Sequence, residues 1–292
     1  MNTTVPSVSV IVPCYKAGPY LARFLASLTA QTYAGRWEAV FIDDGDPDGE
    51  TVYACVTDPR CRVVRQPSNR GVSAARNRGL AETTGEIVLF ADPDDELGPD
   101  WMATLVAGLE GVDCAWGGFR LRTEGAERVC VARDVGAVYR GADVKARIWR
   151  AVFGYRLRDV FRWLTRKRMW RGCGREFANV WCRAFRRSAI RGVRFDETLR
   201  LNEDAIFLAE VAARLTSLRI LGDTGYIYET RPSGAVAVET RERKTANKFA
   251  LRDARRRLDP RKRHWRGTFW LSALEVWRDA GFGAAWRYLF CR

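Results

Sequence analysis

Residues 86–95 read Glu86-Ile87-Val88-Leu89-Phe90-Ala91-Asp92-Pro93-Asp94-Asp95, an apolar run that ends in three carboxylates around a proline. Two earlier stretches have the same form. Val8-Ser9-Val10-Ile11-Val12-Pro13 leads to Tyr15, and Trp37-Glu38-Ala39-Val40-Phe41-Ile42 leads to Asp43-Asp44-Gly45. Short apolar runs of this kind are typical of buried strands that end in a turn.

Helical patterns lie between these runs. Leu21, Phe24, Leu25 and Leu28 fall on one face of a helix, and residues 71–84 have helix composition. A weaker strand is expected at residues 62–65. Strands alternating with helices predict an α/β fold with a mostly parallel sheet, whose ligands bind beyond the carboxyl ends of the strands. The polar residues expected at that edge are Tyr15, Asp43, Asp44, Asp92, Asp94 and Asp95.

The composition is that of a globular protein with an uneven charge. The 292 residues are 47% hydrophobic and carry a formal net charge of +14. Residues 1–139 carry net −6, residues 140–200 net +13 and residues 201–292 net +7. An acidic first half and a basic second half indicate two tasks, the basic part facing an anionic surface.

Several classes of protein are excluded or disfavoured. No stretch approaches the roughly 18 apolar residues of a membrane-spanning helix, and the first residues lack the basic region of a secretory signal. The eight cysteines form no CxxC pair and His264 is the single histidine, which disfavours structural zinc. We therefore expect a cytoplasmic protein with reduced thiols.

The second half has a less regular pattern. A strand-like run is expected at residues 178–181, and Asn202 is expected to cap a helix that begins with Glu203 and Asp204. A charged helix is expected over residues 240–263. The tail, residues 265–292, is aromatic and basic, so it either lies in a membrane interface or packs on the main domain.

Taken alone, each candidate site has two interpretations. The turn Asp92–Asp95 suits Mg²⁺ or Mn²⁺, or is a solvated acidic turn. Asp43-Asp44-Gly45 either binds a base or ribose or is a simple turn. The helix start within residues 70–79 suits a diphosphate, or presents an exposed basic face. Acids such as Glu203-Asp204 are favoured at a helix start in any case, and the same dipole is expected to keep Asp204 ionised, as a general base requires.

Taken together, these segments resemble glycosyltransferase family 2, inverting enzymes of the GT-A fold, over roughly residues 6–235. The fragments that carry the resemblance are Val8–Tyr15, Gln31-Thr32-Tyr33, Ile42–Gly45, Asn69–Asn77, Phe90–Asp95, Trp181–Phe185, Asn202–Phe207 and Tyr226-Ile227-Tyr228. The resemblance implies a nucleotide-sugar donor, a divalent metal and a single displacement at the anomeric carbon.

The resemblance also implies roles on the donor side. Pro13, Tyr15 and Asp44 would hold the nucleotide base, most often uracil, with Asp44 on its N–H edge. Arg76 is a further candidate for a nucleotide contact, and Asp92 would contact the ribose or the metal.

Two more roles follow for the metal and the acceptor. Asp94 would ligate the Mn²⁺ or Mg²⁺ that bridges the diphosphate. Asp204 would take the proton of the acceptor hydroxyl, with Glu203 beside it orienting the acceptor. The sequence departs from the family pattern at Lys16, where Asn is usual, and at Asn202, where Gly is common.

The expected protein is a metal-dependent glycosyltransferase that moves a hexosyl or N-acetylhexosaminyl group, most simply from a UDP-sugar, to a hydroxyl. The acceptor would be a glycan or lipid-linked glycan in cell-surface polysaccharide synthesis, at the inner face of the membrane. The GT-A domain is expected over residues 1–235, with a nucleotide-sugar half at about 1–110 and an acceptor half at about 111–235. Residues 236–292 would form a basic, aromatic helical extension.

Two other functions compete with this one. A nucleotidyltransferase also pairs an α/β sheet with metal-bound carboxylates, but no glycine-rich, Lys-containing loop lies near Pro13. A non-catalytic, basic membrane-binding module would explain the charge of the second half. Nucleic acid is not expected as a partner, because the acidic strand ends would repel its phosphates unless a metal intervened.

Overall fold

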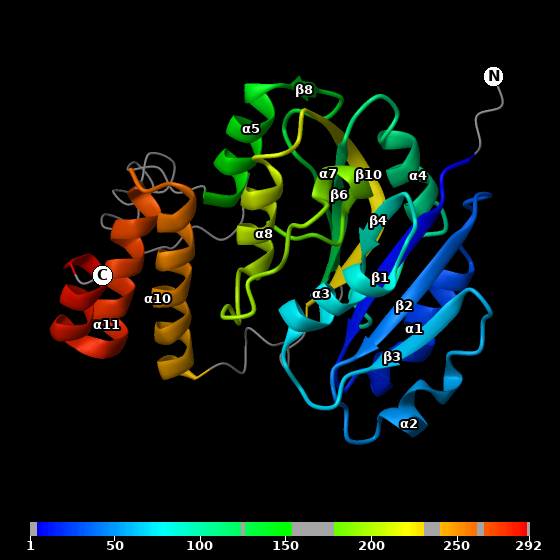
Figure 1. The fold of residues 1–292 in the computed structure, drawn as a ribbon, viewed down its shortest axis with the longest axis horizontal. Coiled ribbons are helices and arrows are strands. Elements are labelled where there is room, and N and C mark those ends of the chain that lie inside the picture. Colours follow the sequence, from blue (N-terminus) through cyan, green and yellow to red (C-terminus); the bar gives the residue numbers. More distant parts are fainter. Residues whose placement is uncertain (1–4, 124–125, 154–177, 231–239, 262–265, 291–292) are drawn as a thin grey trace.

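A computed structural model describes residues 5–123, 126–153, 178–230, 240–261 and 266–290 (Figure 1). The strands are β1 (Val8–Cys14), β2 (Trp37–Asp43), β3 (Cys61–Arg65), β4 (Ile87–Phe90), β5 (Glu96–Leu97), β6 (Cys114–Thr123), β7 (Ala126–Cys130), β8 (Val138–Arg140), β9 (Arg183–Arg186) and β10 (Ser217–Glu229). The helices are α1 (Gly18–Thr29), α2 (Gly49–Val52), the 3-10 turn η1 (Tyr53–Cys55), α3 (Val72–Glu82), α4 (Trp101–Gly108), α5 (Ala142–Phe153), α7 (Arg187–Ile190), α8 (Glu203–Val211), α10 (Arg241–Leu258) and α11 (Arg266–Phe290).

One twisted sheet organises the molecule, in the strand order β3-β2-β1-β4-β9-β6-β10-β5, with β7 beside β6 and β8 beside β10. The first four strands of that order run parallel, as the sequence predicts. Strand β9 then runs antiparallel to both β4 and β6. The carboxyl ends of β1, β2 and β4 therefore lie side by side, and each leads into a candidate site residue.

Both faces of the sheet are covered, which explains why β1 is buried along its whole length. Val10 and Val12 belong to a core that includes residues of α1 and α4. Ile11, which points to the other face, belongs to the core built with α5 and α8. Parallel strands buried on both faces read as continuous apolar runs, which is why these strands were recognisable in the sequence.

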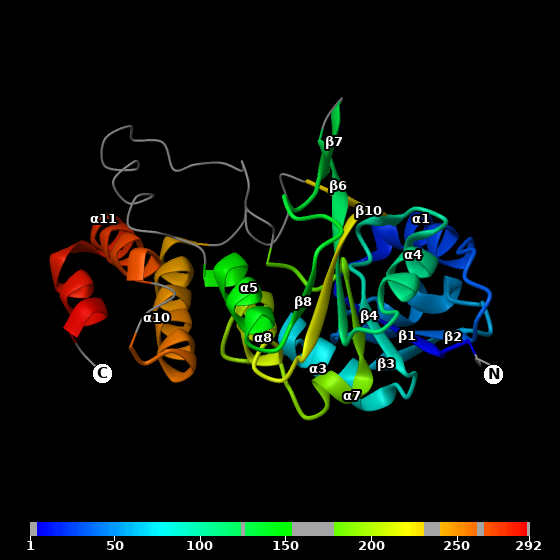
Figure 2. The same cartoon turned by 90° about the horizontal axis from the view of Figure 1, so that it is seen from above.

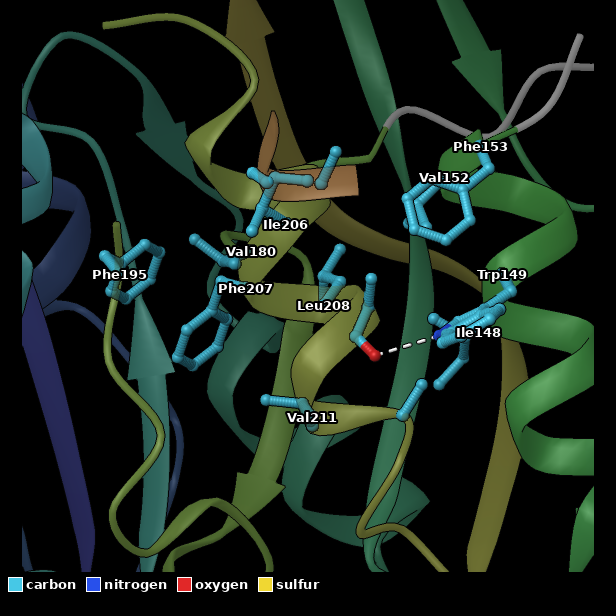
Figure 3. Close-up of a cluster of buried hydrophobic side chains, with 14 of the residues drawn as sticks. Ile148, Trp149, Val152, Phe153, Val180, Phe195, Ile206, Phe207, Leu208 and Val211 are labelled. Atoms are coloured by element: carbon cyan, nitrogen blue, oxygen red, sulfur yellow. Dashed lines mark hydrogen bonds between the residues drawn. The ribbon is translucent and has the colours of Figure 1, made fainter. Parts of the chain in front are cut away.

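Helix α8 is held in place by a close-packed aromatic and aliphatic core (Figure 3). The rings of Phe195 and Phe207 stack with centroids 4.0 Å apart. On the other side, the indole Nε1 of Trp149 in α5 donates to the carbonyl oxygen of Ala209 at 2.9 Å. This packing orients the first turn of α8, which carries Glu203 and Asp204.

The strand expected at residues 178–181 was wrongly predicted, because the strand of this region, β9, begins at Arg183. Residues 180–182 form a turn, in which the Arg183 amide donates to the Val180 carbonyl at 3.2 Å. The apolar side chains of the turn are buried by tertiary packing instead. Trp181 stacks on Tyr226, with ring centroids 4.3 Å apart, and on Tyr228, at 5.3 Å.

The described part of the C-terminal extension is helical, as predicted, and consists of α10 and α11. Figures 1 and 2 show α10 between α8 and α11, so that α11 is the outermost element at that end of the molecule. Leu251 and Ala254 of α10 are buried in the same core as α8. None of the helices in the described ranges is long and apolar enough to span a membrane.

Candidate active site

The turn after β4 is anchored by its last carboxylate, Asp95. Asp95 is buried, and it accepts hydrogen bonds from the Tyr226 hydroxyl at 2.6 Å and from the Glu229 amide at 3.1 Å. The Tyr226 oxygen in turn accepts a bond from the Asp92 amide at 3.1 Å. Burial, together with the charges of Asp94 and Asp92, raises the pKa of Asp95. Asp95 therefore shapes the turn, while Asp92 and Asp94 are only half-buried.

Arg76 of α3 connects this turn to the start of α8. Its guanidinium is buried and donates to Asp92 Oδ1 at 3.2 Å, to Glu203 Oε1 at 2.9 Å and to Asp204 Oδ1 at 2.6 Å. The structure thus brings together carboxylates that lie more than 100 residues apart in the chain. Arg76 was predicted as a nucleotide contact, whereas its described partners are these carboxylates and the ring of Phe195, 5.4 Å away.

A single guanidinium does not compensate three neighbouring carboxylates. Burial raises the pKa of Asp204 to about 8, with Glu203 and Asp92 adding to the rise and Arg76 opposing it. Burial alone would lower the pKa of Arg76, but Asp204, Asp92 and Glu203 raise it above its usual value. Desolvation therefore opposes the helix dipole at Asp204, and the raised pKa runs against the expectation that the dipole keeps this carboxyl ionised at neutral pH.

The local structure at the start of α8 also differs from the prediction. Asn202 occupies the N-cap position, but its backbone is left-handed (φ 63°) and its side chain makes no capping bond. A left-handed backbone explains why glycine is common at this place, since both residues tolerate that conformation. The second oxygen of Asp204 accepts a bond from the Val180 amide at 3.1 Å, a partner with no signal in the sequence.

Both carboxylate oxygens of Asp44 accept hydrogen bonds from the protein. Oδ1 accepts from the Gln66 amide group at 2.7 Å and from the Arg70 backbone at 2.8 Å, and Oδ2 accepts from the Gly71 backbone at 2.8 Å. Gly71 has φ +94°, a conformation that favours glycine. Asp44 therefore holds the loop that starts α3, the helix that carries Arg76. Its contact with a nucleotide base stays a prediction.

The other two residues predicted for the base lie at the neighbouring strand end. Pro13 is buried in β1 opposite Ile42 of β2, and Tyr15 just beyond is exposed. The Asp44 amide donates to the Cys14 carbonyl at 2.8 Å, which joins the two strand ends. Pro13, Tyr15 and Asp44 are thus gathered at one edge of the sheet, beside the turn of Asp92 and Asp94.

A comparison of the sequence with models of protein families identifies one family. The model described as "Glycosyl transferase family 2" matches residues 9–193. This chain belongs to glycosyl transferase family 2. The match includes Pro13, Tyr15, Asp44, Arg76, Asp92 and Asp94, and it ends before Glu203 and Asp204.

Curated relatives of this glycosyl transferase family 2 chain are similar over limited stretches. An N-acetylglucosaminyltransferase of Sinorhizobium fredii is 38% identical over 107 residues, which are 34% of this chain and 25% of that protein. One of Bradyrhizobium elkanii is 34% identical over 38% of this chain and 64% of that protein. The uncharacterized glycosyltransferase EpsJ of Bacillus subtilis is 27% identical over 80% of this chain and 64% of that protein. Each match spans less than two thirds of the relative's own length.

Solved structures share the fold. S. aureus TarS 1–349 has a TM-score of 0.64 and 17% identity, over 97% of this chain and 81% of that chain. The same protein in complex with UDP-GlcNAc has a TM-score of 0.63 and 17% identity, over 93% of this chain and 73% of that chain. At this identity the likeness shows the fold alone, and it confirms the predicted α/β architecture with a helical C-terminal region.

The donor set of the family 2 chain fits a divalent metal that binds together with a diphosphate. Mg²⁺ and Mn²⁺ prefer oxygen ligands and commonly take one or two carboxylates plus substrate phosphates. Asp92 and Asp94 supply two carboxylates on one turn, whose shape Asp95 and Tyr226 maintain. Within the described residues no group of three or more His, Cys, Asp or Glu is placed to hold a metal ion.

Proposed function

We propose that this chain is a metal-dependent inverting glycosyltransferase that uses a UDP-sugar donor and a hydroxyl acceptor. The observation that carries the proposal is the bridge through Arg76, which joins Asp92 on the donor side to Asp204 on the acceptor side. Family membership supports transfer of a glycosyl group. The names of the relatives, and the UDP-GlcNAc bound to S. aureus TarS, favour UDP-N-acetylglucosamine as the first donor to test.

The donor would bind at the carboxyl edge of the parallel strands. In this proposal Tyr15 stacks on the base, while Asp44 and Pro13 shape the loop around it. Asp94 and Asp92 would hold the metal, which would supply positive charge to stabilise the departing nucleoside diphosphate. The exposed ring of Tyr15 supports this placement, because a base needs a flat surface to stack on.

Asp204 would remove the proton from the acceptor hydroxyl as the new bond forms. A base works best when its pKa lies near the working pH, since it is then both ionised and basic enough. Burial raises the pKa of Asp204 to about 8, which supports this role. Glu203, on the same guanidinium, would orient the acceptor. Attack from the face opposite the diphosphate inverts the anomeric carbon.

The acceptor is proposed to be a glycan or lipid-linked glycan of cell-surface polysaccharide synthesis, met at a membrane surface. In this proposal residues 1–235 carry the chemistry and residues 236–292 form an extension that supports it. The excess of basic residues after residue 140 supports an anionic partner, such as a lipid diphosphate.

The test is sugar transfer by the purified chain with UDP-N-acetylglucosamine and Mn²⁺, followed by UDP release. Asp204→Asn should lower kcat at least about 1000-fold while calorimetry shows donor binding nearly unchanged, because the base acts in the transition state. Asp143→Asn, at an exposed position in the first turn of α5, is the matched control and should keep full activity.

Two results would contradict the proposal. Release of pyrophosphate in place of UDP would indicate a nucleotidyltransferase. Loss of donor binding in Asp204→Asn would place this residue on the donor side and remove it as the base. A panel of other nucleotide sugars, screened by thermal shift with Mn²⁺, identifies the donor if UDP-N-acetylglucosamine is not bound.

A further inference from the structure

Helix α11 has one buried and one exposed face. Phe269, Val276 and Tyr288 are buried against the rest of the protein. Other side chains of α11, on both sides of the kink at Gly281, are large, aromatic and exposed to solvent. These are Trp270, Trp277, Phe282, Trp286 and Phe290. Soluble proteins seldom expose so many aromatic side chains in one place, and such patches commonly mark interaction sites.

The last three of these residues form an aromatic row, namely Phe282, Trp286 and Phe290. They follow the kink at Gly281 at intervals of four residues, so they share one helix face. Their exposed fractions are 70%, 53% and 61%. The ring centroids are 6.2 Å apart for Phe282 and Trp286 and 4.3 Å apart for Trp286 and Phe290. These distances make the row continuous, and it belongs to α11, the element at the outer end of the molecule (Figure 2).

Two exposed arginines lie close to the aromatic row in the sequence, and one of them, Arg278, pairs with Asp279 at 2.8 Å. The side chain of Arg278 is 64% exposed, and Arg287 is exposed between Trp286 and Tyr288. Residues 241–292 together contain 15 Lys or Arg and 5 Asp or Glu. This excess of positive charge disfavours a second copy of the same helix as the occupant, because like charges would face each other. Exposed aromatic side chains together with positive charge favour a partner that has an apolar interior and an anionic exterior.

We propose that the aromatic row is a membrane-docking surface that inserts into the interface of a bilayer containing anionic lipids. Aromatic side chains prefer the depth between headgroups and acyl chains, and flanking arginines reach the lipid phosphates. The membrane-docking proposal is independent of the transfer reaction. If the proposed enzymatic activity is not found, the docking proposal still stands, and if docking is not found, the proposed activity still stands.

The test is sedimentation of the full chain with vesicles of phosphatidylglycerol and phosphatidylcholine, compared with phosphatidylcholine alone. The full chain should bind the anionic vesicles much more strongly, and less so at high salt. Replacing the row by Phe282→Ser, Trp286→Ser and Phe290→Ser should lower the partition coefficient by about tenfold per residue. Arg278→Gln with Arg287→Gln should reduce the difference between the two vesicle types.

The control replaces exposed apolar side chains elsewhere, by Val129→Ser, Val131→Ser and Val135→Ser, and should bind like the parent. Substitutions are preferable to truncation, because removing α11 would also remove buried Phe269 and Tyr288. Equal sedimentation of the parent and the aromatic-row variant would overturn the proposal, and so would no binding by the parent. A dimer in solution that the same variant dissociates, without vesicle binding, would assign the row to a second copy instead.

Discussion

At the scale of single residues, Arg76 determines how the acidic groups of the site are arranged. One buried guanidinium donates to Asp92, Glu203 and Asp204, which come from a strand end and from a helix start. An arginine suits this position because its planar fork supplies several donors in fixed directions. Its role as a connector was not predicted, since a sequence does not show which distant carboxylates an arginine meets.

Arg76→Lys should impair both activity and stability. A lysine has one point charge and no fork, so it leaves at least one buried carboxylate without its partner. Unpairing a buried charge costs about 3–5 kcal/mol, and the lysine should recover part of that. Chemical denaturation should show a loss of about 1–3 kcal/mol. Arg78→Lys, on the exposed side of the same helix, should change stability by less than about 0.5 kcal/mol. Equal effects of both would contradict the connector role.

The pH dependence of transfer should follow Asp204. Its pKa is raised to about 8, so the carboxylate that accepts the proton predominates only above that pH. The value of kcat/KM should fall by about tenfold per pH unit below 8 and level off above it. Donor binding measured by calorimetry over the same range serves as the control and should change much less. A profile that is flat from about pH 6 to 9 would show that the pKa of the base is not raised into this range, against the burial effect at Asp204.

At the scale of elements, the close approach of α3 to β1 places Arg76 over the strand ends. Gly79 makes this approach possible, because a Cβ there would lie 2.3 Å from Cγ2 of Ile11. At the other end of the helix, Asp44 holds the amides of Arg70 and Gly71. The sequence predicted this helix and its glycine-containing start, but not the contact distance, which depends on the side chain of another element.

Gly79→Ala should destabilise the protein although alanine favours helices. The added methyl group would have to displace Ile11, and overpacking of this kind costs about 1–3 kcal/mol. Gly283→Ala is the matched control, because a Cβ there meets nothing within 4 Å. It should stabilise α11 by about 0.5–1 kcal/mol. Thermal unfolding of both variants measures the difference, and a stabilising Gly79→Ala would refute the close contact.

At the scale of the whole molecule, the extension and the sheet domain share one core. The side chain of Asn247 in α10 accepts from the amides of Arg200 and Leu201 and donates to the Leu201 carbonyl, at 3.0–3.1 Å. These residues directly precede the left-handed Asn202 and α8. The boundary predicted near residue 235 lies outside the described residues. In the described part of the chain, α10 contacts the segment that leads into the helix carrying Asp204.

Asn247→Ala should weaken the site from a distance. It leaves two amides and one carbonyl without their partner, at a cost of about 1–3 kcal/mol. Transfer should fall through kcat with little change in donor KM, because the donor-side turn does not contact Asn247. Thr245→Ala on the exposed side of α10 is the control and should behave like the parent. An unchanged kcat in Asn247→Ala would show that α8 is positioned without α10.

Local sequence determined the elements and the chemistry at their ends. Runs such as residues 8–13 and 87–91 are buried on both faces of the sheet, so they can be recognised as buried strands from their continuous apolar sequence alone. The acidic turn at Asp92–Asp95, the helix beginning at Glu203 and the helical extension were predicted for similar reasons. The role of Asn247 is less evident from the sequence. The available hint is that asparagine is unfavourable inside a helix, so its presence there suggests that its side chain makes hydrogen bonds.

Only the tertiary structure decided how these parts act on one another. Trp181 was assigned to a strand because an apolar residue looks the same in a strand and in a packed turn. The charge state of Asp204 depends on burial and on Glu203, Asp92 and Arg76, and Asp92 and Arg76 lie more than 100 residues away in the chain. Electrostatic and packing energies depend on distances in space. A sequence fixes those distances only for residues that are neighbours in the chain.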